Sequence, residues 1–473
     1  MLGPVWAILC WLTAGQSIAA TEPSKSICPA QLRNEIEAIA NRPQLRRARL
    51  GILVETLSPA VTIYSRDAGQ YFVPASNAKL LTTAAALQHL GPQFRIRTSV
   101  YGSSDNSVQV VGRGDPSLTD DRLTELAQQL SRQGIRQVSH LFAVDNYFRG
   151  QPINPSWEWE DINSDYGAAV NSLILNQNVE GLTLFPSGNG RSLRVVWSDP
   201  TEAGQWQVEN RIAVKSDEPS SISVSRDLAK PVLHLQGQLG GTAPVSLSLP
   251  VLNPTEHFLQ HFRHALAVQK IAVAAASTSD SLAHPSQVRE LAFVESPPLS
   301  QLLVETNQNS NNLYAEVLLR TLGTQTSDSS TEDKIGLQIL KATLTELGVD
   351  STGYVLVDGS GLSRHNLVSP EALVQTLRSM AQSKIAAVYR ASLPVAGISG
   401  TLQNRFRNTT AQGILQAKTG SMSGVAAISG YLNDPDYEPL VFSAIVNQSD
   451  QSATVLRQSL DEIVLLLTRL HQC

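Results

Sequence analysis

The 473-residue chain has only three cysteines, no run of basic residues and a single long apolar run, which lies at its start. Lysine and arginine number 36 against 41 aspartates and glutamates, and no aromatic residues are interleaved with basic ones, which argues against a nucleic-acid partner. No later apolar stretch reaches the length of about 18 residues that a membrane-spanning helix needs. The sequence therefore predicts a mature protein that is soluble or peripherally bound to a membrane.

The apolar run at the start has the pattern of a secretory signal peptide. Residues 1–20 contain an apolar core, Val5–Leu12, and end in small residues, although no lysine or arginine precedes the core. We expect removal of residues 1–20 and a periplasmic or extracytoplasmic location. The apolar core includes Cys10, so only Cys28 and Cys473 would remain, either as a disulfide or as two thiols.

A Ser-x-x-Lys motif, Ser76 to Lys79, opens a run rich in alanine and leucine that follows Pro74 and stops at Gly91-Pro92. This pattern predicts a helix with Ser76 in its first turn, and residues three apart share a helix face. The Lys79 amine would then lie near the Ser76 hydroxyl and could accept its proton if burial or a neighbouring cation such as Lys418 lowered its pKa. The alternative is a serine that merely caps the helix.

Two further short motifs follow in order, Ser310-Asn311-Asn312 and Lys418-Thr419-Gly420. Taken alone, the first could be a polar helix cap, with its register left open by neighbouring asparagines, and the second a surface turn with a solvated lysine. Together with Ser-x-x-Lys, they resemble the serine penicillin-recognising family, which includes penicillin-binding proteins and serine β-lactamases.

The stretch between Ser76 and Ser310 is too long for an ordinary connection, so we expect an inserted unit there. It contains several short β-type runs separated by glycine and proline. These runs are residues 97–101, 107–111, 192–197, 232–238 and 245–249. We predict a β-rich insert at 98–284, with a smaller module nested at 174–250, between the two parts of a catalytic domain at 21–97 and 285–473.

Within the catalytic parts, the pattern predicts two strands near the start, helices between the insert and Gly420, two strands after Gly420, and a closing helix. The predicted strands are residues 50–54, 61–64, 425–432 and 440–447, and the predicted helices are 299–305, 313–322, 333–347 and 460–470.

The long insert and three local segments restrict the resemblance to one subgroup of this family. Gly112–Leu118, Val144–Phe148 and Asp358–Leu367 are similar to segments of the class C low-molecular-mass penicillin-binding proteins, serine peptidase family S13. These are D-alanyl-D-alanine carboxypeptidases and endopeptidases of the cell wall. The resemblance covers essentially the whole mature chain. It implies an α/β penicillin-recognising domain, with an antiparallel sheet flanked by helices, that needs no metal or organic cofactor.

The resemblance also implies roles for the motif residues. Ser76 would attack the carbonyl of the penultimate D-alanine and form an acyl-enzyme, with Lys79 as general base. Ser310 would relay a proton to the leaving amine, and Asn312 would orient Lys79 and the substrate. Peptidoglycan stem peptides would be the substrates, and β-lactam antibiotics would be covalent inhibitors.

By the same resemblance, Lys418 and Thr419 would hold the substrate carboxylate from an edge strand of the main sheet. The small Gly420 would let the substrate backbone approach closely, and the N–H groups of Ser421 and Ser76 would form the oxyanion hole.

Two pairs of residues receive roles from the resemblance alone. Asp145 and Arg364 match positions that recognise the side-chain end of meso-diaminopimelate; the alternative is a turn aspartate and an intramolecular salt bridge. In the family, the first and last helices pack side by side, which would bring Cys28 close to Cys473 and favours a disulfide.

Two rival functions stay open. A β-lactamase would share the acylation machinery, but no deacylating glutamate is identifiable and Ser310 stands where class C β-lactamases have a tyrosine. A catalytically silent peptidoglycan-binding protein would not be acylated by penicillin. A metal site at His257, His261 and His264 is disfavoured, because the phenylalanines interleaved with them indicate an ordinary packed helix.

Overall fold

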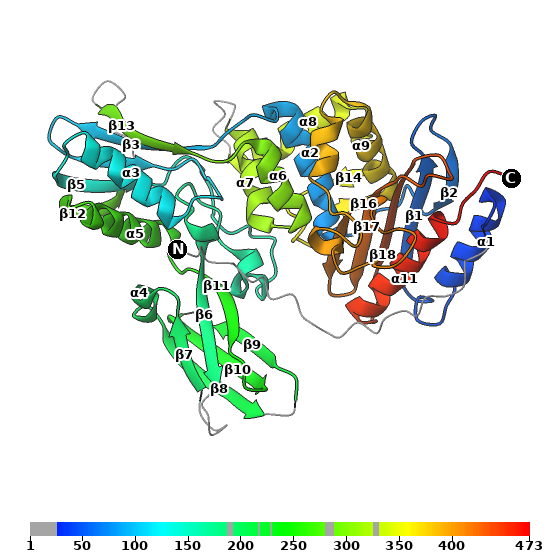
Figure 1. The fold of residues 1–473 in the computed structure, drawn as a ribbon, viewed down its shortest axis with the longest axis horizontal. Coiled ribbons are helices and arrows are strands. Elements are labelled where there is room, and N and C mark those ends of the chain that lie inside the picture. Colours follow the sequence, from blue (N-terminus) through cyan, green and yellow to red (C-terminus); the bar gives the residue numbers. More distant parts are fainter. Residues whose placement is uncertain (1–25, 187–192, 216–217, 228, 280–287, 325–330) are drawn as a thin grey trace. The chain divides into compact units, whose positions relative to one another are not determined.

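The computed structural model describes residues 26–186, 193–215, 218–227, 229–279, 288–324 and 331–473 (Figure 1). The predicted signal peptide, 1–20, lies outside these residues. The described chain forms two compact units: a small unit, mainly Val179–Pro250, and a large unit that contains nearly all the rest. Among the described helices, none is both long and apolar enough to cross a bilayer.

The main sheet of the large unit is antiparallel throughout and has the strand order β16-β17-β18-β1-β2. Its strands come from both ends of the chain: β1 (Arg49–Thr56), β2 (Thr62–Arg66), β16 (Leu415–Met422), β17 (Val425–Leu432) and β18 (Leu440–Asn447). The predicted antiparallel sheet flanked by helices is confirmed, and so are its four predicted strands.

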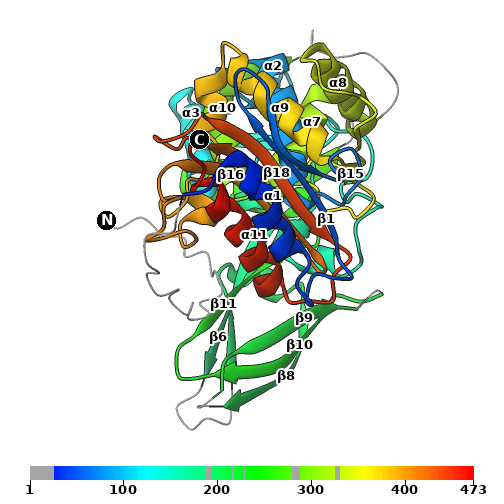
Figure 2. The same cartoon turned by 90° about the vertical axis from the view of Figure 1, so that its right-hand side faces the viewer.

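Each face of this sheet is covered by helices, because successive side chains of a strand point to opposite sides. On β1, Ile52 and Val54 join the core beneath α1 (Pro29–Ala40) and α11 (Ala453–Leu467), whereas Leu53 joins the core on the other face. Figure 2 shows α1 and α11 side by side on this face. Just outside the two helices, Cys28 and Cys473 form a disulfide, with their Cα atoms 5.8 Å apart.

The opposite face carries a second group of helices, two of which contain the motif residues Lys79 and Asn312. They are α2 (Lys79–Leu90), α6 (Leu299–Gln308), α7 (Asn312–Gly323), α8 (Glu332–Glu346), α9 (Pro370–Gln382) and α10 (Ala386–Ala391). A short hairpin of β14 (Tyr354–Val355) and β15 (Leu367–Val368) lies between α8 and α9 in the sequence. Every residue of α7 is buried, so both ends of this helix are fixed by packing.

A second five-stranded sheet forms from the sequence between the first two motifs, in the order β12-β5-β4-β3-β13. Its strands are β3 (Arg97–Ser103), β4 (Val108–Val111), β5 (Gln137–Val144), β12 (Ala272–Ser279) and β13 (Val288–Glu295). The pairs β4–β5 and β5–β12 are parallel, and the chain crosses over between them through α3 (Asp120–Arg132) and α5 (Pro254–Val268). The insert is therefore not simply β-rich, since two helices pack on its sheet.

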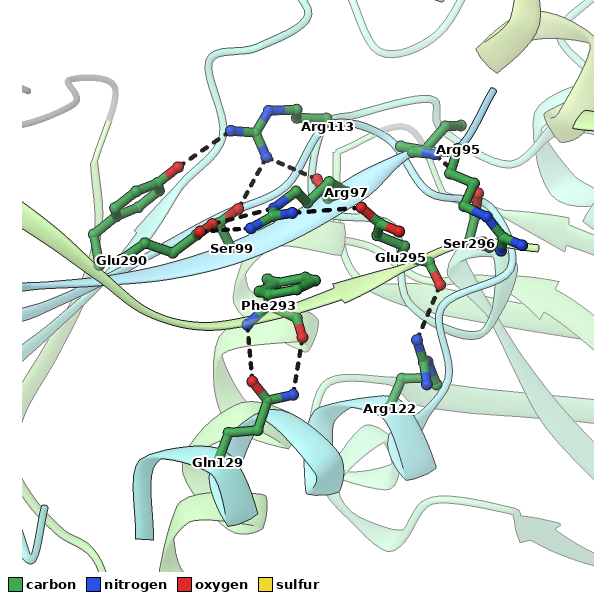
Figure 3. Close-up of polar contacts among 12 residues, drawn as sticks. Arg95, Arg97, Ser99, Arg113, Arg122, Gln129, Glu290, Phe293, Glu295 and Ser296 are labelled. Atoms are coloured by element: carbon green, nitrogen blue, oxygen red, sulfur yellow. Dashed lines mark hydrogen bonds and ion pairs between the residues drawn. The ribbon is translucent and has the colours of Figure 1, made fainter. Parts of the chain in front are cut away.

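The outer edge of β13 is covered by side chains of α3 (Figure 3). Gln129 accepts from the N–H of Phe293 at 3.1 Å and donates to its carbonyl at 2.9 Å, and Arg122 donates to the carbonyl of Glu295 at 2.9 Å. On β3, the Arg97 guanidinium lies 3.5 Å from the centre of the Phe293 ring. Gln129 and Arg122 thus form hydrogen bonds with backbone groups of β13 that would otherwise be free to pair with an added strand.

The small unit is built from two three-stranded sheets, β11-β6-β7 and β8-β10-β9. Its elements are β6 (Val179–Pro186), β7 (Leu193–Trp197), α4 (Pro200–Ala203), β8 (Gln207–Lys215), β9 (Ser221–Arg226), β10 (Val232–Gly240) and β11 (Val245–Pro250). Leucines of β6 and β10 meet in its core. Asn178 and Val251, which precede and follow Val179–Pro250 in the sequence, belong to the large unit. The Val251 N–H donates a hydrogen bond to the Asn178 carbonyl at 3.0 Å.

Candidate active site

Ser76 lies in a short 3₁₀ turn, Ala75–Ala78, that leads directly into α2. The sequence predicted an α-helix over this stretch, and the tighter first turn is the difference. Lys79 is the first residue of α2, and its Nζ lies 2.9 Å from the Ser76 Oγ. The local spacing thus brings the predicted nucleophile and base together.

The Lys79 amine is fully buried and contacts three oxygens. Besides Ser76 Oγ, these are Asn312 Oδ1 and the Ser360 carbonyl, each 2.7 Å from Nζ. An amide oxygen and a carbonyl oxygen can only accept hydrogen bonds. A neutral amine would therefore donate its two N–H groups to them and direct its lone pair at the Ser76 hydroxyl. This is the geometry that a general base requires.

Burial lowers the pKa of Lys79 to about 7, against the opposing charges of Asp358 and Glu316. Of the two causes that the sequence left open, burial and a neighbouring cation such as Lys418, burial is the one that lowers this pKa. The repulsion between the two lysines affects Lys418 instead. Burial and the nearby Lys79 together hold the pKa of Lys418 well below its usual range. Near neutral pH, Lys79 is thus available in its uncharged form.

Ser310 and Lys418 also lie in contact. The Ser310 Oγ is 2.8 Å from Lys418 Nζ, which also donates to the Thr419 carbonyl at 2.9 Å. Ser310 connects α6 to α7 in the left-handed backbone region, with φ of 58°. Lys418 and Thr419 lie on β16, the edge strand of the main sheet, as the resemblance implied.

Gly420 allows β16 to lie against the turn that carries Ser76. A Cβ atom at this position would be 2.6 Å from the Pro74 carbonyl oxygen and 3.2 Å from the Ser76 nitrogen. The resemblance implied that the missing side chain lets the substrate backbone approach closely. The side that a Cβ would occupy faces the turn that carries Ser76, and the next residue, Ser421, is exposed.

Glu316 is a buried acid that the sequence analysis did not identify. Its Oε1 accepts from the N–H groups of Gly359 and Ser360, at 3.0 and 2.7 Å. Burial and the nearby Asp358 raise its pKa. It lies one helical turn after Asn312 on α7, and this spacing was a readable signal that both face the same site.

Asp358 organises the segment that supplies the Ser360 carbonyl. Its carboxylate accepts from the N–H groups of Gly361 and Ser363, at 2.8 and 2.7 Å, and from the side chains of Asn366 and Trp157, at 2.8 and 3.1 Å. The segment Asp358–Leu367 was the most specific local match in the sequence. Its structural contribution is to fix one of the three oxygens around Lys79.

Asp145 and Arg364 both have partners within the protein. The Asp145 carboxylate accepts from the Ser172 N–H and Asn171 Nδ2, each at 2.7 Å, and from the Thr255 hydroxyl. Arg364 Nε lies 3.0 Å from the Glu158 carboxylate, and Nη1 donates to the Ser423 carbonyl at 3.0 Å. The Arg364 side chain is still 34% exposed. These are the contacts expected of the structural alternatives, and the substrate roles stay predictions.

Among the described residues, one cluster of side chains has metal-ligand chemistry. Cys28, His471 and Cys473 lie together, but the two sulfurs are joined in the disulfide and so are not thiolate ligands. In α5, His257 is buried and its ring lies against that of His261, with ring centroids 4.2 Å apart, while His261 Nδ1 lies 2.6 Å from an Asp120 oxygen.

The chain was compared with known proteins. Residues 32–470 match the family model described as the D-Ala-D-Ala carboxypeptidase 3 (S13) family. The chain is 34% identical to a D-alanyl-D-alanine carboxypeptidase of Actinomadura sp. (strain R39), over 88% of this chain and 81% of the relative. It is 31% identical to penicillin-sensitive carboxypeptidase A of Dictyostelium discoideum, over 89% of this chain and 87% of the relative.

Among solved structures, penicillin binding protein 4 of Haemophilus influenzae has the same fold. Its TM-score is 0.78 at 22% identity, with 93% of this chain and 98% of that chain covered. A second structure of that protein is complexed with a β-lactam. Given the family match over most of its length and the relatives above 30% identity, the chain belongs to the D-Ala-D-Ala carboxypeptidase 3 (S13) family of serine peptidases.

Proposed function

We propose that this protein is a serine D-alanyl-D-alanine carboxypeptidase and endopeptidase that cleaves peptidoglycan stem peptides through an acyl-enzyme on Ser76. The observation that carries this proposal is the set of oxygens around Lys79. Two of them can only accept hydrogen bonds, so the lone pair of the neutral amine faces the third, Ser76 Oγ.

The reaction begins when Lys79 takes the Ser76 proton and Oγ attacks the carbonyl carbon of the penultimate D-alanine. The N–H groups of Ser76 and Ser421 donate to the oxyanion that forms. Ser310, in contact with Lys418, passes a proton to the nitrogen of the terminal residue. The amide bond then breaks, D-alanine or a cross-linked peptide leaves as the amine, and water hydrolyses the Ser76 ester.

Two groups of residues are proposed to bind the substrate. Lys418 and Thr419 hold its terminal carboxylate from the edge strand, which agrees with the position of the Lys418 amine beside Ser310. Arg364 pairs with the carboxylate at the side-chain end of diaminopimelate, and Asp145 with its ammonium. The partial exposure of Arg364 supports its part of this proposal.

The proposed cellular location follows from the predicted signal peptide and from the proposed substrate, peptidoglycan. We propose export directed by residues 1–20 and action in the periplasmic or extracytoplasmic space, as a soluble or peripherally bound protein. We also propose the division into a catalytic domain, 21–97 and 285–473, and an insert, 98–284. The disulfide supports an oxidising compartment.

The test is the intact mass of the protein after incubation with benzylpenicillin, beside a Ser76→Ala variant. A lasting adduct on the wild type alone, together with release of D-alanine from a stem peptide, is the expected result. Rapid hydrolysis of the drug without an adduct would indicate a β-lactamase. No adduct and no hydrolysis would indicate a silent peptidoglycan-binding protein and overturn the proposal.

A further inference from the structure

Three consecutive residues of the large unit adopt a left-handed backbone. Asn176, Gln177 and Asn178 have φ of 48°, 61° and 56°. This region costs an L-residue about 1–2 kcal/mol, with asparagine the least disfavoured of the three types present. Such a run persists only where the surrounding structure fixes it, and it marks segments whose conformation serves a function.

The two outer residues of this turn are fixed to the insert. Asn178 is fully buried and donates to the Ala169 carbonyl and to Asn171 Oδ1, each at 2.8 Å. Asn176 donates to Asp120 at 2.9 Å. With both neighbours held, the side chain of the middle residue, Gln177, is directed toward a different partner.

That partner is the middle residue of the Ser310–Asn312 motif. Gln177 Oε1 accepts from Asn311 Nδ2 at 2.7 Å. On its other side, Asn311 Oδ1 accepts from the Tyr314 N–H at 3.2 Å and so caps α7. The Asn311 side chain is thus held at both ends of its amide, immediately between Ser310 and Asn312.

This position governs where the flanking side chains point. Ser310 is itself left-handed and contacts Lys418, whereas Asn312 begins α7 and contacts Lys79. A rotation at Asn311 would move one or both of these side chains away from its lysine. The hydrogen bond that Asn311 donates to Gln177 opposes that rotation, together with the longer one that it donates to Glu305 at 3.4 Å and the one that it accepts from the Tyr314 N–H.

We propose that Gln177 is a positioning residue. Its amide oxygen holds Asn311, so that Ser310 stays in contact with Lys418 and Asn312 with Lys79. The inference rests on the proposed function of this site, and it adds a residue that lies outside the three motifs. Gln177 acts before bond breaking and does not touch the reacting atoms.

The test compares three variants by the kinetics of acylation with benzylpenicillin. Gln177→Gly removes the amide and suits the left-handed backbone, whereas Gln177→Met keeps the length of the side chain without an amide oxygen. Asn176→Gly is the matched control, because it also removes one amide hydrogen bond from a left-handed position in the same turn.

Both Gln177 variants are expected to lower the acylation rate constant at saturating drug by about threefold to tenfold, the effect of one hydrogen bond. The dissociation constant of the non-covalent complex, the fraction of protein acylated at completion and the melting temperature should match those of Asn176→Gly, which should acylate at the wild-type rate.

Each other outcome has a distinct meaning. Wild-type rate constants in both Gln177 variants would overturn the inference while leaving the proposed function intact. An equal loss in Asn176→Gly would also overturn it, since the effect would then belong to the turn and not to the contact with Asn311. Absence of acylation in the wild type would overturn the proposed function, and the inference with it.

Discussion

Asn312 and Glu316 lie one turn apart on α7 and reach the Lys79 amine by two routes. Asn312 Oδ1 contacts Nζ directly at 2.7 Å. Glu316 accepts from the Ser360 N–H at 2.7 Å, and the Ser360 carbonyl accepts from Nζ at 2.7 Å. One helix therefore contacts the amine directly and also supplies Glu316, whose charge, with that of Asp358, opposes the lowering of the Lys79 pKa by burial.

The pH dependence of acylation should follow the protonation of Lys79. The neutral amine is the base, so the rate should fall as the pH drops through the Lys79 pKa of about 7. In Glu316→Gln, an amide oxygen can still accept from Gly359 and Ser360, but one of the two charges that raise the Lys79 pKa is gone, and only that of Asp358 is left. The acid limb of the rate profile should therefore move to lower pH.

The measurement is the acylation rate constant as a function of pH for both proteins. Glu346→Gln, at an exposed position of α8, is the control and should leave the profile unchanged. A limb that stays in place in Glu316→Gln, or moves to higher pH, would contradict the assignment of Lys79 as the base.

Gly420→Ala should impair acylation, because the added methyl would meet the Pro74 carbonyl and displace the Ser76 turn. We expect a fall in acylation rate of at least about tenfold and a loss of about 1–3 kcal/mol in the free energy of unfolding. Stopped-flow acylation and denaturant unfolding measure the two effects. Gly69→Ala is the control, since the nearest atom to its new methyl would be 3.7 Å away. Unimpaired acylation in Gly420→Ala would show that the turn yields easily.

Arg364→Ala separates substrate recognition from structural support. If Arg364 binds diaminopimelate, turnover of a stem peptide containing that residue should fall by about tenfold or more, while benzylpenicillin acylation stays unchanged. If its contacts with Glu158 and Ser423 are its whole function, both reactions should fall together. Arg407→Ala, at an exposed arginine, serves as the comparison for non-specific charge effects.

The small unit should be removable without loss of acylation. The motif residues and their hydrogen-bond partners all lie in the large unit, and Asn178 and Val251 are already in hydrogen-bond contact. We expect a chain with 179–250 replaced by a short glycine-serine linker to react with benzylpenicillin at the wild-type rate. A folded, unreactive deletion protein, identified by its circular dichroism spectrum and lack of adduct, would show that the small unit contributes to the active site.

Replacing both cysteines, Cys28→Ser with Cys473→Ser, should lower the free energy of unfolding by about 2–5 kcal/mol. The acylation rate should not change, because neither cysteine contacts a motif residue in the described structure. Denaturant unfolding with and without a reducing agent measures the effect, and reduction should leave the variant unaltered. Equal stability of the oxidised wild type and the variant would contradict this prediction.

The sequence predicted the parts of this structure that depend on short-range patterns. Ser76 and Lys79 are neighbours because of their spacing in one turn, and the strands of the main sheet follow from runs of apolar residues. The leucines of α3 at 123, 126 and 130 also had a readable helical period, which was overlooked because the insert was interpreted from its strands.

Other features depend on contacts that no local pattern contains. Glu316 reaches Ser360 across 44 positions of sequence, so its role follows only from the packing of α7 against that segment. Burial lowers the Lys79 pKa for the same reason, and the sequence therefore left burial and a neighbouring cation as alternative causes. The contacts of Asp145 within the insert likewise depend on the return of the chain at Asn171 and Thr255.

The bond between Cys28 and Cys473 makes the protein between these positions a closed covalent ring. Cleavage of one peptide bond at any point of the ring opens it but releases no piece. A molecule cut once would therefore migrate as one species on a non-reducing gel and as two fragments after reduction. Two separate cuts would be needed to free a fragment while the disulfide is intact. After a first cut by a protease, the ring therefore keeps the strands contributed by both ends of the chain tethered to each other.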